Sequence, residues 1–204
     1  MIKSVNQLIT ERCNSKCKMC SIWNLKNKPY EMTPQEFNRL YSKPEFKEVE
    51  DLCISGGEPT LRRDLFELTT AILKNLPKLR MLFLSTNGSN PQTVRDFVKK
   101  YNQKAPEIYI CLSLEGDKET HKKIRGVDTY DKVIKTAKLV KSLKIKKCHV
   151  IFSTTIVPEN CNKESLDHIR SLSKYLGCTF SFRIASKNAT FYHNVKSKNI
   201  LINP

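Results

Sequence analysis

The chain has 204 residues, of which 39% are hydrophobic and 27% charged, a composition typical of a folded soluble domain and not of a disordered segment. It has no apolar run long enough to span a membrane and no signal peptide at its start, so we expect one cytoplasmic domain over residues 1–204 and no membrane partner. The net charge of +16 comes mostly from lysines spread along the chain. A lysine-rich bias explains this charge as well as RNA binding does, so nucleic acid is the less favoured partner.

Short β-rich segments alternate along the chain with longer helical segments. The predicted strands are residues 5–10, 49–55, 80–86, 108–114, 148–155 and 179–184. Several of them, such as residues 81–84, are nearly continuous apolar runs. Such runs are typical of parallel strands that are buried on both faces.

Five helices are predicted between these strands. The first begins after Thr33, which forms a capping box with Glu36 and is followed by a proline at the first helical position. Apolar periodicity places the next three helices over residues 64–73, from residue 90 to at least residue 101, and over residues 129–143. The last begins after Asn162 and ends at Gly177, a residue type that commonly terminates helices.

Alternating βα units predict a parallel sheet with right-handed crossovers. Six strands and five helices favour an α/β fold of the partial (β/α)6 TIM-like barrel type over a closed eight-stranded barrel. A doubly wound open sheet is the alternative, and the local pattern does not separate the two. In barrels of parallel strands, ligands bind at the carboxyl ends of the strands. The residues that follow each strand are therefore the candidate site residues.

Three of the eight cysteines lie within eight residues, directly after the first predicted strand. Cys13, Cys17 and Cys20 form a C-x3-C-x2-C motif. Thiolates are the ligands that iron–sulfur clusters require, and three of them can hold three corners of a cube while the fourth iron stays open. A structural zinc site usually has four protein ligands. A redox pair made of Cys17 and Cys20 would leave Cys13 unexplained.

The other five cysteines are scattered along the chain. They are Cys53, Cys111, Cys148, Cys161 and Cys178. A cytosolic chain is not expected to form a disulfide framework, and a cysteine in an apolar run behaves as a small buried hydrophobic residue.

A C-x3-C-x2-C motif after the first strand of a βα series resembles the signature of the radical S-adenosylmethionine (radical SAM) superfamily. The resemblance implies that Cys13, Cys17 and Cys20 hold a [4Fe–4S] cluster whose fourth iron binds S-adenosylmethionine. In that family an electron from the cluster cleaves the sulfonium, and the resulting 5′-deoxyadenosyl radical takes a hydrogen atom from the substrate. Met19 stands where the family usually has an aromatic or other apolar residue beside the adenine.

A Gly-Gly-Glu-Pro segment follows the second predicted strand. From the residues alone it is a turn, in which glycines allow the backbone to approach another group closely. In the resembled family this element binds the amino group of the cofactor's methionine moiety. The resemblance therefore adds Gly56, Gly57, Glu58 and Pro59 to the cofactor site.

Polar residues that end the third and fourth strands extend the resemblance. Ser85 and Asn87 lie where the family contacts the ribose or the methionine moiety. Ser113 and Arg125 lie in a segment resembling the family's Ser-Leu-Asp-Gly stretch and the Arg-Gly pair that follows it. There the serine and arginine approach the ribose and the carboxylate of the cofactor, and a guanidinium fork suits a carboxylate.

Three further polar residues have less defined roles. Glu115 replaces the more usual aspartate of this segment, and we assign it no role. For His121, a surface or helix-capping position is favoured. Arg183 is expected to face the pocket, because a charge in an apolar strand needs a partner.

The sequence thus predicts a radical SAM core domain acting on a peptide or a small metabolite, with a donor such as flavodoxin or ferredoxin supplying electrons. No residue is identified as a catalytic acid or base. Similar enzymes often carry a carboxyl-terminal extension with further clusters, and Cys161 and Cys178 lack the clustered spacing of such ligands. Either there is one cluster, or the extension is absent from this chain. The alternative is a non-catalytic iron–sulfur or zinc protein, an electron carrier or binding module, with a fourth ligand and no cofactor affinity.

Overall fold

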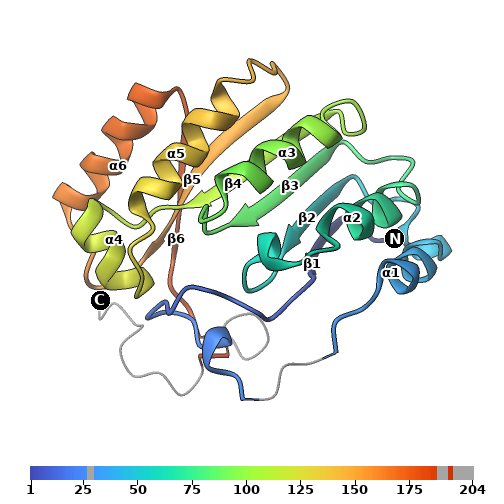
Figure 1. Ribbon diagram of the computed structural model, residues 1–204, viewed down its shortest axis with the longest axis horizontal. Coiled ribbons are helices and arrows are strands. Elements are labelled where there is room, and N and C mark those ends of the chain that lie inside the picture. The colour runs from blue at the N-terminus through green and yellow to red at the C-terminus, as the bar shows by residue number, and fades with distance from the viewer. Residues whose placement is uncertain (27–29, 188–192, 195–204) are drawn as a thin grey trace.

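Six parallel strands form one open sheet in the order of the sequence, from β1 to β6 (Figure 1). The computed structural model describes residues 1–26, 30–187 and 193–194. The strands are β1 (Ser4–Leu8), β2 (Asp51–Ser55), β3 (Met81–Thr86), β4 (Glu107–Ser113), β5 (Cys148–Ile156) and β6 (Thr179–Ile184). This sequential order confirms the partial (β/α)6 barrel, because a doubly wound sheet reverses its strand order near the middle.

Helices cover the outer side of the curved sheet (Figure 1). They are α1 (Pro34–Tyr41), α2 (Leu65–Leu73), α3 (Pro91–Tyr101), α4 (Lys118–Arg125), α5 (Tyr130–Lys141) and α6 (Lys163–Leu176). Three short 3-10 helices, η1 (Ile22–Asn24), η2 (Pro44–Phe46) and η3 (Pro59–Leu61), lie in connections. The predicted capping box of α1 is present, with Thr33 accepting a hydrogen bond from the Glu36 backbone. Gly177 ends α6 in the left-handed conformation, as predicted.

Helix α4 is not among the helices predicted from the sequence. Its start and end signals are present, since Asp117 caps its first turn and Gly126 ends it with a φ of +69°. However, only His121 and Ile124 of this highly charged helix are buried, so it has no apolar stripe that would reveal it.

The two faces of the sheet differ in burial. Side chains such as Leu52, Leu82 and Ile110 are fully buried against the helices, and each contributes about 1.5–3 kcal/mol to folding. The concave face is only half-buried, so the expected burial on both faces is wrong. Phe83 and Tyr109 stack there with ring centroids 4.7 Å apart. Apolar content alone does not distinguish a covered face from an open one.

Among the residues that the structure describes, no helix is both long enough and apolar enough to cross a membrane.

His121 fixes α4 to its neighbours from a fully buried position, which differs from the favoured surface or capping role. Its Nδ1 accepts a hydrogen bond from the Glu115 backbone N–H at 3.3 Å. Its Nε2 therefore carries the proton and donates to the Thr129 hydroxyl at 3.0 Å. Burial lowers the pKa of His121 to about 3, and the charge of Arg125 adds to this shift.

This lowered pKa predicts acid sensitivity. Below a pH of about 6.5 the unfolded chain takes up a proton at His121 that the native chain does not bind, so the free energy of unfolding falls as the pH decreases. His121→Asn should remove up to about 1.4 kcal/mol per pH unit of this dependence between pH 6 and 4. Denaturant unfolding at several pH values measures both slopes, and equal slopes in the two proteins would contradict the assignment.

Candidate functional site

The loop that follows β1 carries the three cysteines and passes across the carboxyl ends of the strands to the end of α4 (Figure 1). We call residues 13–20 the cysteine loop. Cys17 is buried, whereas Cys13 and Cys20 are half-buried. The loop has little apolar content, so its shape depends on contacts with three neighbouring segments.

The first neighbour is the Gly-Gly turn after β2, which contacts residues 10–12 at the point where they lead into the cysteine loop. Gly57 donates a backbone hydrogen bond to the Thr10 carbonyl at 2.7 Å, and Glu58 donates one to the Arg12 carbonyl at 2.8 Å. A Cβ atom would lie 2.4 Å from the Thr10 oxygen at Gly56 and 2.3 Å from the Arg12 oxygen at Gly57. Both glycines therefore allow a backbone approach that any side chain would prevent.

Glu58 joins this turn to the end of β3. Its carboxylate is fully buried and accepts four hydrogen bonds. Two come from Thr60, one from the Thr86 hydroxyl at 2.7 Å and one from the Asn87 backbone at 2.6 Å. A carboxylate with this many donors is well compensated for its burial. In the described structure, Glu58 thus fixes two strand ends relative to each other.

The segment after β3 is the second neighbour of the cysteine loop. The Asn87 amide donates to the Asn14 side-chain oxygen at 2.7 Å and to the Ser15 hydroxyl at 3.0 Å. Asn14 in turn donates to the Ser89 hydroxyl at 3.0 Å. Side chains thus attach the loop here, whereas the Gly-Gly turn holds residues 10–12 through the backbone.

The end of α4 is the third neighbour. Lys16 donates its backbone N–H to the Arg125 carbonyl, and Lys18 donates to the Ile124 carbonyl, both at 2.9 Å. A Cβ atom at Gly126 would lie 2.5 Å from the Lys16 oxygen. Gly126 is therefore needed both for its left-handed φ and for the close passage of the loop.

Arg125 lies beside the cysteines and forms a buried ion pair with Glu115. Its Nη1 donates to Glu115 at 3.2 Å, and the other carboxylate oxygen accepts from the Thr155 backbone at 2.8 Å. Burial raises the pKa of Glu115, and Arg125 opposes that rise. Burial works against the charge of Arg125, but Cys17 and Glu115 outweigh it and raise the pKa of Arg125 above its ordinary value.

The three thiols are close enough to influence one another. Burial raises the pKa of Cys17 to about 12; the charge of Arg125 opposes the rise, while Cys13 and Cys20 add to it. Burial also raises the pKa of the Cys13 and Cys20 thiols. These thiols need a cationic partner to become thiolates, which is what a metal supplies.

The donor set fits an iron–sulfur cube. Among the described residues, no three His, Cys, Asp or Glu side chains gather closely enough to hold a single metal ion. The three ligands of a cube bind different iron atoms, so they need not gather so closely. The Nε of Arg125 is buried and has no hydrogen-bond partner among the described residues. A buried guanidinium nitrogen of this kind is suited to an anionic group beside the thiols.

The remaining predicted residues lie around the same strand ends. Met19 is buried in a small apolar cluster with Cys17 and Ile124. Pro59 is buried at the start of η3. Ser85 on β3 and Ser113 on β4 are half-buried. These positions are near the site, but their contacts do not assign them a role.

Arg183 lies on the concave face, as expected. It pairs in register with Thr155, and its charge reaches two thiols on the same face. Burial raises the pKa of Cys53 to about 12 and that of Cys111 to about 11, while Arg183 opposes both rises. Arg183 thus places a positive charge inside the open barrel.

Several residues that hold the site together were not predicted from the sequence. Glu115 had no assigned role, yet it contacts both Arg125 and the end of β5. Asn14, Ser15 and Ser89 attach the loop to the segment after β3. The polar residues inside the motif were a signal, but their partners lie more than 70 residues away in the sequence.

Comparison with known families and relatives supports the resemblance. The family model described as the Radical SAM superfamily matches residues 8–172. A protein of Pyrococcus abyssi named as a probable GTP 3′,8-cyclase is 30% identical over 128 residues, covering 62% of this chain and 40% of the relative. A Saccharolobus islandicus protein of the same name is 28% identical over 172 residues, covering 83% and 52%. The chain thus spans about half the length of these curated relatives or less.

Solved structures share the fold. SuiB of Streptococcus suis, bound to the precursor peptide SuiA, superposes with a TM-score of 0.73 at 19% identity, covering 96% of this chain and 42% of SuiB. The enzyme anSMEcpe with bound S-adenosylmethionine gives 0.69 at 20% identity, covering 94% and 55%. Methylornithine synthase (PylB) gives 0.67 at 16% identity, covering 97% and 58%. At these identities the likeness shows the partial TIM-like barrel.

Two glycines form a matched pair that tests the third contact of the cysteine loop. Gly126 and Gly177 both end helices with left-handed φ values, of +69° and +61°. At Gly177 a Cβ would meet only Lys141, at 3.6 Å, so Gly177→Ala should cost about 1–2 kcal/mol of strain. Gly126→Ala adds the clash with Lys16 and should destabilise the chain further and lower its iron content.

Denaturant unfolding and iron analysis after anaerobic reconstitution measure both effects. Equal unfolding free energies and equal iron contents in the two variants would show that the contact with Lys16 does not shape the loop.

Proposed function

Because this chain belongs to the radical SAM superfamily, we propose that its cysteine loop holds a [4Fe–4S] cluster at which S-adenosylmethionine is reductively cleaved. One observation supports this most directly: three thiols on one loop lie beside a buried guanidinium whose Nε has no partner among the described residues. Members of this family use the cluster and this cofactor. When bound, the cluster would supply one electron that cleaves the sulfonium of the cofactor, and the resulting 5′-deoxyadenosyl radical would take hydrogen from the substrate.

The cysteines take the role of iron ligands in this proposal. Cys13, Cys17 and Cys20 hold three corners of the cube, and the fourth iron remains open for the cofactor. Arg125 stabilises the thiolates and offers its Nε to the cofactor's carboxylate. Glu115 positions Arg125, because its second oxygen is anchored to the backbone of Thr155.

The strand ends form the rest of the proposed cofactor shell. The backbone around Gly56 and Gly57 faces the amino group of the cofactor, with Pro59 fixing the exit of the turn. The carboxylate of Glu58 is already occupied by four hydrogen bonds, so we assign it to holding this turn against Asn87. The remaining residues of the proposed shell are Met19 beside the adenine, and Ser85, Asn87 and Ser113 near the ribose or the methionine moiety.

The concave face indicates a polar substrate. Each of the strands β2 to β6 contributes one serine hydroxyl to this face: Ser55, Ser85, Ser113, Ser153 and Ser181. The charge of Arg183 lies among them. A peptide or a small polar metabolite fits this surface, and the name of the curated relatives makes GTP the first small molecule to test.

The competing hypothesis is a non-catalytic metalloprotein, either an electron carrier or a zinc-stabilised module. It requires a fourth protein ligand beside the cysteine loop. Two carboxylates of the described structure, Glu58 and Glu115, are near enough to affect the thiols electrostatically. Glu58 already accepts four hydrogen bonds, and Glu115 is held by Arg125 and the Thr155 backbone, so neither is available as a fourth ligand. The enzyme is therefore the better supported proposal.

Anaerobic reconstitution tests the proposal. The dithionite-reduced protein should show a cluster EPR signal that shifts on addition of S-adenosylmethionine, and it should release 5′-deoxyadenosine. Cys17→Ala should assemble little or no cluster, because two thiolates hold a cube poorly, whereas Cys161→Ala, at an exposed cysteine, is the matched control and should behave as wild type. A zinc-only protein, or a cluster signal insensitive to the cofactor, would refute the enzyme.

Arg125→Ala tests the cofactor contact separately from cluster assembly. The cluster should still form, but the affinity for S-adenosylmethionine should fall by about 1–3 kcal/mol, the range for a lost hydrogen bond to a charged group. Arg125→Ala also leaves Glu115 buried without its partner, so the double variant Arg125→Ala/Glu115→Gln separates lost binding from lost stability. EPR titration with the cofactor measures the affinity, and normal binding in both variants would remove Arg125 from the site.

A further inference from the structure

The cysteine loop has a buried side and an exposed side. Ser15, Cys17 and Met19 are buried, whereas Lys16 and Lys18 between them are exposed. The side chain of Cys17 points into the protein, and the flanking lysine backbones lie one residue away, about 3.8 Å between successive Cα atoms. The outer surface of the loop is thus separated from a proposed iron ligand by a single residue.

Helix α4 extends this basic surface. Its Lys122 and Lys123 are exposed, and they line a hollow of about 390 Å³ together with Glu119, Gly126 and Val127. Gly126 contacts Lys16, which joins the hollow to the loop. We call Lys16, Lys18, Lys122 and Lys123 the lysine patch.

Two acidic residues lie beside the lysine patch. Glu159 pairs with Lys18 at 2.6 Å, and Lys123 also helps lower the pKa of Glu159, which burial opposes. Glu119 lies in the hollow with Lys122 and Lys123. The four lysines of the patch outnumber these two carboxylates, so the six residues together carry a positive charge.

We propose that the lysine patch is the docking surface for a small acidic protein that carries a one-electron flavin or iron–sulfur centre. This inference rests on the proposed function, because it requires a cluster on the cysteine loop. One electron passes from the donor, which is oxidised, to the cluster, which is reduced, and no bond forms or breaks. The concave side of the loop is needed for the cofactor and the substrate, so the donor must approach from the outer side.

Charge complementarity favours an acidic protein partner. Opposite charges steer two proteins together and raise the association rate by about 10 to 1,000-fold at low ionic strength. Lys16 and Lys18 of the patch flank Cys17, the proposed iron ligand, so the electron has a short path from the docked donor to the cluster. Nucleic acid would satisfy the same charge, but it cannot supply the electron.

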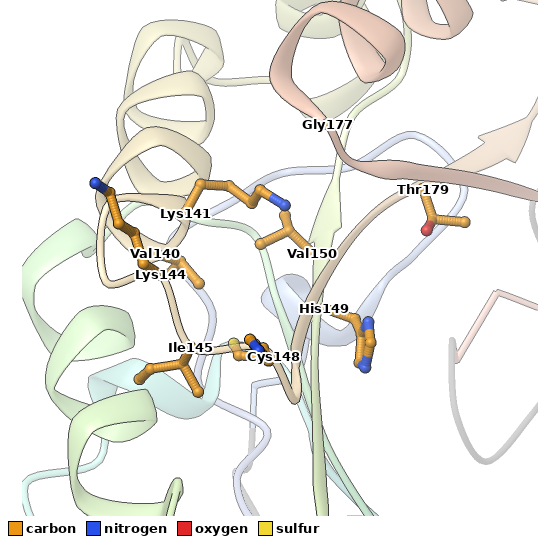
Figure 2. Close-up of a pocket in the computed structure, with 10 residues that line it drawn as sticks. Val140, Lys141, Lys144, Ile145, Cys148, His149, Val150, Gly177 and Thr179 are labelled. Atoms are coloured by element: carbon orange, nitrogen blue, oxygen red, sulfur yellow. The ribbon is translucent and has the colours of Figure 1, made fainter.

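A second basic surface at the other edge of the sheet provides a matched control. Figure 2 shows Lys141, Lys144 and His149 around a hollow of about 300 Å³ at the start of β5 and β6, and Lys146 also lines it. This edge is opposite to the carboxyl ends where the cysteine loop lies. The variants Lys122→Glu/Lys123→Glu and Lys144→Glu/Lys146→Glu change the net charge equally at the two surfaces.

The experiment uses the reconstituted holoprotein and flavodoxin hydroquinone as the donor. Stopped-flow absorbance follows reduction of the cluster at low ionic strength. Lys122→Glu/Lys123→Glu should slow reduction by flavodoxin about tenfold or more and weaken binding of oxidised flavodoxin, whereas the control pair should stay close to wild type. Added salt should bring the three rates together, since it screens exposed charges. Dithionite should reduce all three proteins equally.

Several results would overturn the docking surface. The first is an equal slowing in both pairs, and the second is no slowing in either pair. The third is loss of binding to a short single-stranded RNA with unchanged reduction by flavodoxin, which would assign the patch to nucleic acid. If the variant reduced more slowly with dithionite as well, the patch would act on the cluster itself. A wild-type protein without a dithionite-reducible cluster would instead refute the proposed function.

Discussion

The site depends on one constraint: a polar loop with almost no core of its own must take a fixed shape at the end of a sheet. Backbone contact supplies that shape. Gly56 and Gly57 approach residues 10–12, which lead into the loop, and Gly126 approaches Lys16 of the loop itself, so closely that no Cβ fits at any of the three glycines. Glycine at these positions is therefore a packing requirement as much as a conformational one, and hydrogen bonds from Asn87 complete the attachment.

Much of the fold could be predicted from the sequence because its strands are apolar runs bounded by polar residues. The bounds of β6 agree at both ends, and those of the other strands differ by one or two residues. Helix α4 could not be found in this way, since only two of its residues are buried. The open concave face was also unpredictable, because Phe83 and Tyr109 look like core residues in the sequence.

The candidate site was predictable in its residues but not in its connections. The cysteines and the Gly-Gly pair follow strands, where parallel barrels place their ligands, and Arg125 ends the helix that comes after β4. The positioning role of Glu115 could not be assigned from the sequence, because it depends on a hydrogen bond from the backbone of Thr155, 40 residues further along the chain. Burying the ion pair of Glu115 and Arg125 costs desolvation free energy, which only well-placed hydrogen bonds offset. Both groups therefore need the end of β5 in place.

The three contacts of the cysteine loop also set the order in which the protein can mature. The loop is translated more than 100 residues before its last backbone partners, Ile124 and Arg125, which belong to the fourth βα unit. Such sequence-distant contacts form late in folding. The newly made thiols therefore stay accessible until α4 has been translated. A proposed cluster would therefore meet a shaped loop only in a chain that has folded as far as α4.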